Sequence, residues 1–202
     1  INNSILNVVN YITIRSGLAL MTSLFFILIF GPHLIKLISR FQSEGQPIRL
    51  DGPQSHLIAK KGTPTMGGFI ILLSIIISIL LWSNFSSQIL WPCLFIMISF
   101  GAIGFLDDYK KISNNTSDGV SGKTKIILET LCALAFVIWS TSLNLDNQRL
   151  LSLPFLKDIY INLGFFFIPF VIFVIIGSAN AVNLTDGLDG LAIVPIMIVA
   201  LT

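Results

Sequence analysis

The chain has 202 residues, of which 54% are hydrophobic and only 11% are charged, and its mean hydropathy is +0.87. An ordinary soluble domain carries roughly 25% charged residues, so this composition excludes a water-soluble globular enzyme as well as a disordered chain. The net charge of +2 is too small to indicate a partner made of nucleic acid. The sequence is therefore typical of a helical integral membrane protein.

Five apolar stretches resemble membrane-spanning helices, which need about 20 mostly apolar residues each. They cover approximately residues 17–37, 66–82, 89–106, 126–143 and 163–179. A sixth stretch begins at Leu191 and is still apolar where the sequence ends at Thr202. We therefore expect an all-α, polytopic helical membrane protein with about five full spans and the start of a sixth. Residues 1–202 are expected to form a single membrane domain that is truncated at its C-terminus.

Positive charge is distributed unevenly between the segments that connect these spans. Nine of the 12 Lys and Arg residues lie in the segments at about 41–65, 107–125 and 180–190, or at the adjoining end of the first span. The positive-inside rule places such segments in the cytoplasm, so the N-terminus is expected on the opposite side. These three loops also carry most of the polar residues that solubility alone does not explain.

The first loop ends in a segment rich in Gly and Thr, KKGTPTMGG, at residues 60–68. One interpretation is structural: Thr63 caps a helix, Pro64 occupies its first position, and the two lysines anchor the membrane interface. The other is an anion site, in which a helix N-terminus, two ammonium groups and exposed glycine backbone bind a phosphate. Residue types leave both interpretations open.

The second loop begins with an adjacent carboxylate pair, Asp107 and Asp108, followed by Lys110 and Lys111. Carboxylates at the C-terminal end of a helix oppose its macrodipole, by roughly 0.3–1 kcal/mol each. Either the two lysines or a divalent cation such as Mg²⁺ could compensate for this charge. Because adjacent helical side chains diverge by about 100°, both carboxylates are expected to face one site only if the helix frays there.

In the third loop an Asn or Asp recurs at every third position, namely Asn180, Asn183, Asp186 and Asp189. Side chains three positions apart are neighbours on a helix, so these residues would form one polar stripe. One Asn or Asp is enough to cap a helix end, whereas four in register favour ligand recognition. Their amide and carboxylate groups suit the edge of a nucleobase or the hydroxyls of a sugar.

The three loops together would place lysines, helix N-termini, a carboxylate pair and an Asn/Asp stripe at the inner membrane face. Such a set suits phosphoryl transfer, in which catalysis consists mostly of positioning and charge neutralisation. A site at the membrane surface further indicates one soluble and one lipid substrate. A proton-coupled transporter is the alternative from another class, and it predicts ionisable residues near span centres. The spans contain almost none, Glu129 being the main exception.

Four segments carry a family resemblance: DGPQSH at 51–56, GTPTMGG at 62–68, FLDDYKK at 105–111 and NAVNLTDGLDGLA at 180–192. They resemble the phospho-N-acetylmuramoyl-pentapeptide transferase family, part of the polyprenyl-phosphate N-acetylhexosamine-1-phosphate transferase superfamily. The resemblance implies a magnesium-dependent enzyme of the bacterial plasma (inner) membrane with ten spans, a cytoplasmic active site and a homodimeric state. Such an enzyme transfers phospho-MurNAc-pentapeptide from its UDP carrier to undecaprenyl phosphate, giving lipid I and UMP.

The resemblance also implies roles for individual residues. Asp107 and Asp108 match the essential aspartate pair as catalytic residues and as Mg²⁺ ligands, and Asp107 is the one expected to deprotonate the lipid phosphate. The implied substrate-binding positions are Lys60, Thr65, Lys125, Asn183, Asp186, Gly187, Leu188 and Asp189. The first two match positions near the nucleotide, Lys125 matches a lysine placed for phosphate, and the last three border the uracil pocket.

Two features of the family have no counterpart in this sequence. A third aspartate, in an F-x-G-D-x-G-S segment, and a histidine-rich loop follow later in that family and would lie beyond Thr202. Because that aspartate is a principal metal ligand, we expect the 202 residues alone to be inactive. The later loop also reads the sugar, which leaves a sister transferase of UDP-N-acetylglucosamine as an alternative.

Overall fold

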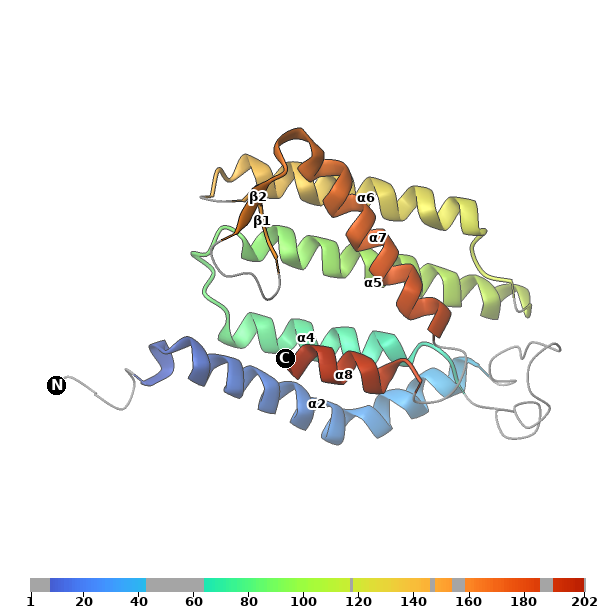
Figure 1. Ribbon diagram of the computed structural model, residues 1–202. Helices are drawn as coiled ribbons and strands as arrows, with labels where there is room; N and C mark the ends of the chain where they lie inside the picture. The colour runs from blue at the N-terminus through green and yellow to red at the C-terminus, as the bar shows by residue number, and fades with distance from the viewer. Residues whose placement is uncertain are drawn as a thin grey trace. The chain divides into compact units, whose positions relative to one another are not determined.

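The computed structural model (Figure 1) describes residues 8–42, 64–116, 118–145, 148–153, 159–185 and 191–201. Most of these residues are helical, as expected for apolar segments in a membrane, where the polar backbone groups must bond to one another. In chain order the helices are η1 (Val8–Asn10), α2 (Ile12–Phe41), α4 (Gly67–Trp82), α5 (Leu90–Asn114), α6 (Gly122–Ser142), η2 (Gly164–Phe166), α7 (Phe167–Thr185) and α8 (Ile193–Leu201). Two short strands, β1 (Leu150–Ser152) and β2 (Tyr160–Asn162), complete the described elements.

Several of these helices have the length and composition of membrane spans. Among the described residues, four segments are long and apolar enough to cross a membrane: Ile12–Arg40, Leu90–Asn114, Gly122–Ser142 and Gly164–Thr185. The helix α4 is also apolar but has 16 residues, about 24 Å of helix against a hydrocarbon core of about 30 Å. The predicted class, a polytopic helical membrane protein, is therefore confirmed, while the second predicted span is shorter than a full crossing.

The helices α5 and α7 extend furthest beyond the C-terminal ends of their predicted apolar stretches. The helix α5 continues past Leu106 to Asn114, and α7 continues past Ala179 to Thr185. Once a helix has formed, each added residue gains a backbone hydrogen bond, so the helix propagates into polar sequence where hydropathy no longer marks it. As a result, the carboxylate pair lies inside α5 and not at its C-terminal end.

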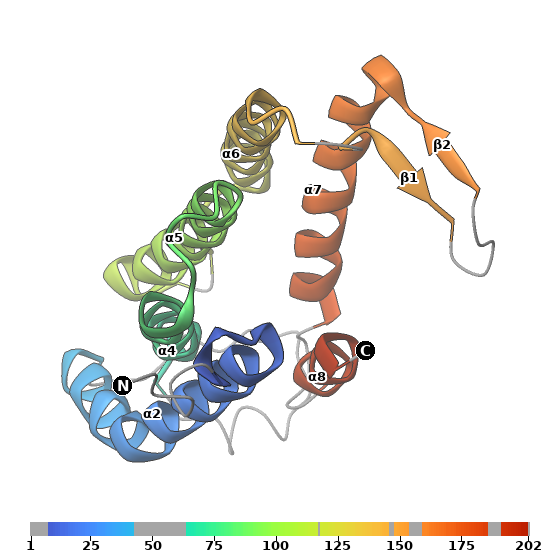
Figure 2. The ribbon, with the colours of Figure 1, turned by 90° about the vertical axis from the view of Figure 1, so that its left-hand side faces the viewer.

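The chain divides into two compact units, Ile1–Thr124 and Lys125–Thr202. In the first unit α4 lies between α2 and α5 (Figure 2), and it runs antiparallel to α2. Trp82, the last residue of α4, donates from Nε1 to Thr22 Oγ1 at 2.9 Å and accepts from Arg15 Nε at its carbonyl oxygen at 2.6 Å. These bonds satisfy a carbonyl group that the end of α4 leaves open, and they join α4 to α2.

Small residues allow α4 and α5 to pack closely. Gly101 of α5 lies against Leu72 of α4, and a Cβ atom at Gly101 would overlap the leucine side chain. Ser74 of α4 is fully buried and donates its hydroxyl to the carbonyl oxygen of Ile71 at 2.7 Å. Small residues of this kind are typical of helix interfaces in membranes. The helix α5 is thereby fixed on the α2–α4 pair.

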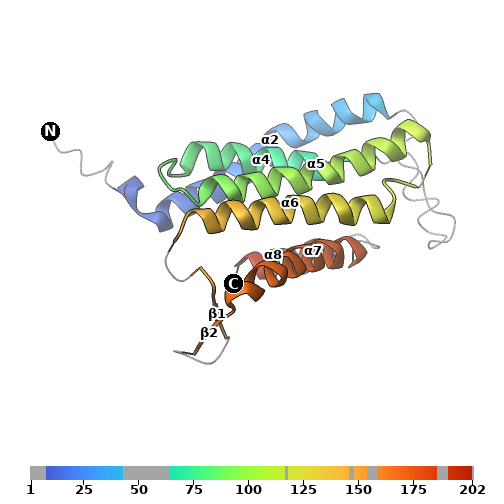
Figure 3. The ribbon, with the colours of Figure 1, turned by 90° about the horizontal axis from the view of Figure 1, so that it is seen from above.

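The second unit contains a β-hairpin that sequence analysis did not predict. The strands β1 and β2 pair antiparallel, with Leu151 opposite Ile161, and the hairpin leads into η2 and α7 (Figure 3). Three residues are too few for the alternating pattern by which strands are recognised in a sequence. In the same unit Asn180 of α7 donates from Nδ2 to Glu129 Oε2 of α6 at 2.6 Å, which connects these two helices.

Candidate active site

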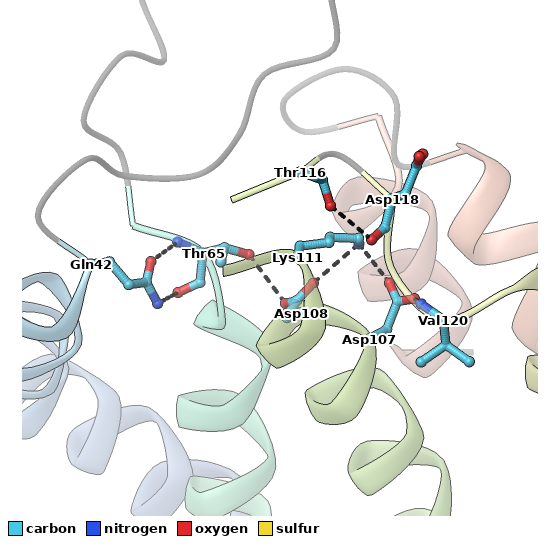
Figure 4. A network of polar contacts seen from close by, with 8 residues as sticks. All are labelled: Gln42, Thr65, Asp107, Asp108, Lys111, Thr116, Asp118 and Val120. Carbon is cyan, nitrogen blue, oxygen red and sulfur yellow. Dashed lines mark hydrogen bonds and ion pairs between the residues drawn. The ribbon is translucent and has the colours of Figure 1, made fainter. Parts of the chain in front are cut away.

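The carboxylate pair on α5 is held by a lysine one helical turn further along. Lys111 Nζ lies 2.5 Å from Asp107 Oδ2 and 3.3 Å from Asp108 Oδ1 (Figure 4). Pairing of the carboxylates with a nearby lysine is therefore confirmed for Lys111. The prediction that both carboxylates face one site only if the helix frays is wrong, because positions i+3 and i+4 place one long lysine side chain within reach of both.

The three charged side chains of this cluster are partly exposed. The ammonium group of Lys111 contacts both carboxylates, and the exposed fraction of the side chain is 18% for Asp107, 29% for Asp108 and 29% for Lys111. Ion pairs that remain partly open to solvent are screened by it, so their contribution to stability is modest. The two adjacent carboxylates are also oxygen ligands of the kind that a divalent cation binds.

Two other segments of the first unit also contact the carboxylates. Thr65, just before α4, donates its hydroxyl to Asp108 Oδ2 at 3.1 Å. The backbone N–H of Val120, just before α6, donates to Asp107 Oδ1 at 2.8 Å. Figure 4 shows these contacts on opposite sides of the pair, with Lys111 between the two aspartates. Hydrogen bonds to charged groups are about twice as strong as neutral ones, so they fix the directions of both carboxylates.

Gln42, the residue after α2, holds Thr65 in place. Its side chain is buried, its Oε1 accepts from the backbone N–H of Thr65 at 2.9 Å, and its Nε2 donates to the Thr65 carbonyl at 3.5 Å. The structural interpretation, in which Pro64 is the first helical residue, is wrong for this segment. The helix α4 begins at Gly67, after Met66 in a left-handed conformation with φ of 72°.

Sequence analysis missed Gln42 and Val120 as parts of this cluster. Gln42 is one of several polar residues that follow an apolar helix, and no motif distinguishes it. Val120 contributes a backbone N–H, which every residue except proline possesses, so its side chain carries no signal. Only the return of the chain after α5 brings that N–H to Asp107.

The structure describes five of the ten predicted site residues, and three of these five lie together. Thr65, Asp107 and Asp108 come together in the first unit as described above. Lys125, in the first turn of α6, is half-buried, and Asn183, on α7, is exposed; both belong to the second unit. Lys60, Asp186, Gly187, Leu188 and Asp189 lie outside the described residues.

Asn180, the first residue of the predicted polar stripe, contacts another helix of the protein. Asn180 has a protein partner, since its Nδ2 bonds to Glu129 Oε2 at 2.6 Å and also to the carbonyl of Ile176 at 3.0 Å. Asn183, one turn further along α7, is exposed. The first member of the stripe therefore joins two helices, whereas Asn183 is exposed.

Comparison with known proteins defines the class. Residues 89–202 match the model of glycosyl transferase family 4, and residues 60–72 match signature 1 of phospho-N-acetylmuramoyl-pentapeptide-transferase. The chain therefore belongs to glycosyl transferase family 4. The signature covers Thr65, and the family model covers both aspartates of the cluster.

Within that family the chain is similar to one particular group of enzymes. It is 51% identical over 198 residues to the phospho-N-acetylmuramoyl-pentapeptide-transferase of Bartonella quintana, 50% over 199 residues to that of Rickettsia akari, and 48% over 197 residues to that of a Ruegeria species. These alignments cover 96–98% of this chain and 54–55% of each relative. The chain thus spans about half the length of the curated relatives it matches, and the resemblance noted in the sequence is confirmed.

Proposed function

We propose that the chain forms part of an enzyme that transfers phospho-MurNAc-pentapeptide from its UDP carrier to undecaprenyl phosphate, releasing UMP and giving lipid I. The observation that carries the proposal is the aspartate pair, whose two carboxylates are held side by side by Lys111, Thr65 and Val120. The names of the relatives and the match to signature 1 support the muramoyl substrate over the UDP-N-acetylglucosamine alternative. They also favour a transferase over a transporter.

Asp107 is proposed to accept the proton of the lipid phosphate. The freed phosphate oxygen attacks the β-phosphorus of the UDP-linked substrate, the bond from that phosphorus to the bridging oxygen breaks, and UMP leaves with the bond electrons. Val120 N–H and Lys111 Nζ bind one oxygen each of Asp107. These two bonds fix the direction of the Asp107 carboxylate, which is the proton acceptor in the proposed step.

Magnesium fits the cluster by donor type. Mg²⁺ is bound in proteins by one or two carboxylates together with phosphate oxygens and water, and Asp107 and Asp108 supply two adjacent carboxylates. Among the described residues no group of three or more His, Cys, Asp or Glu side chains gathers as a metal site. Asp107 and Asp108 would hold the ion, which neutralises charge on the diphosphate when bound.

The remaining predicted residues are proposed to bind the nucleotide substrate. Thr65 and Lys60 would lie near the nucleotide and Lys125 near a phosphate, since lysines and hydroxyls are the usual partners of phosphate oxygens. The uracil and ribose would be recognised by Asn183, Asp186, Gly187, Leu188 and Asp189. We further propose that the enzyme is a homodimer in the bacterial plasma membrane with its active site on the cytoplasmic face.

Product analysis tests the proposed reaction. A full-length protein that contains this chain should release UMP and form lipid I when supplied with UDP-MurNAc-pentapeptide, undecaprenyl phosphate and Mg²⁺. The matched reaction contains UDP-N-acetylglucosamine as the only nucleotide sugar, and it should give no lipid product. Lipid-linked N-acetylglucosamine as the sole product would contradict the proposed substrate.

Cysteine labelling in intact cells tests the proposed orientation. After replacement of the native Cys93 and Cys132 by alanine, a single cysteine is introduced at Ser113 near the end of α5 or at Ser86 beyond α4, both of which are exposed. A membrane-impermeant maleimide should label the Ser86→Cys variant directly and the Ser113→Cys variant only after permeabilisation. The opposite pattern would place the cluster outside the cell and contradict the proposal.

A further inference from the structure

The chain returns over Asp107 directly after α5 ends. Asn115, beyond the last residue of that helix, has φ of 49°, and Thr116 N–H bonds to the Lys111 carbonyl at 3.1 Å. Thr116 also donates its hydroxyl to the Asp118 carbonyl at 3.4 Å (Figure 4). The next residues then lie against the carboxylate of Asp107, to which Val120 donates its N–H.

Gly119 lies against this carboxylate with no room for a side chain. A Cβ atom added to Gly119 would overlap Asp107 Oδ1 and would lie only 2.6 Å from its Cγ and 2.9 Å from its Oδ2. By contrast, a Cβ atom added to Gly104, one turn before Asp107 on α5, would have no atom within 4 Å other than the backbone of its own helix. Among the described glycines, Gly164 alone has a positive φ. Gly119 is therefore required for space and not for an unusual backbone conformation.

The carboxylate cannot move away from position 119 without losing partners. Lys111 Nζ lies 2.5 Å from Asp107 Oδ2, Val120 N lies 2.8 Å from Asp107 Oδ1, and the Asp107 side chain is only 18% exposed. A methyl group at position 119 would displace the oxygen that Val120 binds. Rotation of the carboxylate would then break a charge-assisted hydrogen bond, which is stronger than a neutral one.

We propose that Gly119 is a positioning residue for Asp107: its lack of a side chain lets the segment after α5 bring a backbone N–H onto the carboxylate and set its direction. This inference rests on the proposed function, in which Asp107 accepts the proton of the lipid phosphate. In this proposal Gly119 does not bind substrate itself and affects the reaction only through the Asp107 carboxylate.

The first test compares Gly119→Ala with the control Gly104→Ala in a full-length protein that contains this chain. A misplacement of a reacting group by about 1 Å can cost roughly 100-fold in rate, so kcat for UMP release should fall by about that factor in Gly119→Ala. The KM for UDP-MurNAc-pentapeptide should stay within about twofold, since nucleotide contacts are unaffected. Gly104→Ala should keep the parent kcat within about twofold. An equally active Gly119→Ala enzyme would overturn the inference.

The second test measures thermal unfolding and does not depend on activity. Gly119→Ala should lower the Tm by about 2 °C or more in the parent and should have no such effect in an Asp107→Ala background, where the overlapping carboxylate is absent. An equal loss in both backgrounds would mean that the methyl group meets another part of the chain, and it would overturn the inference. If the coupling in Tm is present but Asp107→Asn still turns over substrate, the proposed proton transfer fails while the contact between Gly119 and Asp107 stands.

Discussion

Two sets of acidic side chains in this molecule have very different surroundings. Glu129 on α6 is 2% exposed and accepts a hydrogen bond from the neutral amide of Asn180 at 2.6 Å. Asp107 and Asp108 on α5 are 18% and 29% exposed, and they share one ammonium group, that of Lys111. The first arrangement is closed to solvent, whereas the second is partly exposed and contains an ammonium group in contact with both acids.

This comparison distinguishes Glu129, which joins two helices, from Asp107 and Asp108, which are proposed to take part in the reaction. A buried carboxyl group in an apolar protein is costly unless it is hydrogen-bonded, and the bond to Asn180 meets that need. The aspartate pair has partners on several sides, yet both side chains keep access to solvent. The two kinds of acid therefore differ in solvent access and in the type of partner, and these differences favour the aspartate pair as the candidate site.

Among the residues that surround the aspartate pair and the buried acid, the largest effect is expected from neutralising the ammonium group of Lys111. Lys111→Gln keeps most of the side-chain length but removes the charge between the two carboxylates, which then repel each other and turn apart. We expect kcat for UMP release to fall by about 100-fold in a full-length protein. Lys110→Gln is the matched control, because this neighbouring lysine is exposed, and it should stay within about threefold of the parent. Equal losses in both variants would contradict a specific role for Lys111.

A smaller effect on the turnover rate is expected from removing the Thr65 hydroxyl, which donates a hydrogen bond to Asp108. Thr65→Val keeps the shape of the side chain but removes the hydrogen bond to Asp108 Oδ2. A hydrogen bond to a charged group is worth about 1.5–3 kcal/mol, so the turnover rate should fall about tenfold or more. Thr65→Ser retains the hydroxyl and should recover most of the rate. If the serine variant were as slow as the valine variant, the hydroxyl would not be the group that matters.

The smallest effect on turnover is expected at Glu129. Glu129→Gln keeps an acceptor oxygen for Asn180, so both the turnover rate and the Tm should stay close to those of the parent. Glu129→Ala leaves the amide of Asn180 without that acceptor and should lower the free energy of unfolding by about 1–3 kcal/mol. Thermal unfolding in detergent separates the two variants. A Glu129→Gln protein that folds normally but loses turnover would contradict a purely structural role for Glu129.

Residue types and hydropathy were enough to predict the helical membrane class and the carboxylate pair. Apolar stretches mark the centres of helices because lipid demands both a helical backbone and apolar side chains. The same signal fails at helix ends, which is why Asp107 was predicted near the end of its helix although α5 continues to Asn114. An adjacent acidic pair beside an apolar span is rare enough to be noticed without a structure.

The contacts that orient the pair could not be predicted, because they join segments far apart in the chain. Gln42 bonds to Thr65 across 23 positions, and Val120 reaches Asp107 through its backbone. Likewise Asn180 was grouped with the polar stripe, since spacing alone does not reveal that it faces Glu129. Such pairings depend on how helices pack, which a single sequence does not specify.

The rate of UMP release by the Asp107→Asn variant of a full-length protein tests the central claim most directly. Asparagine keeps the size of the side chain and an oxygen for Val120 N–H, but it cannot accept the proton of the lipid phosphate. Since a positioned base contributes about 10²–10⁴-fold, kcat should fall to about 1% of the parent value or less while the protein stays folded. A folded Asp107→Asn protein that releases UMP at close to the parent rate would contradict the assignment of Asp107 as the proton acceptor.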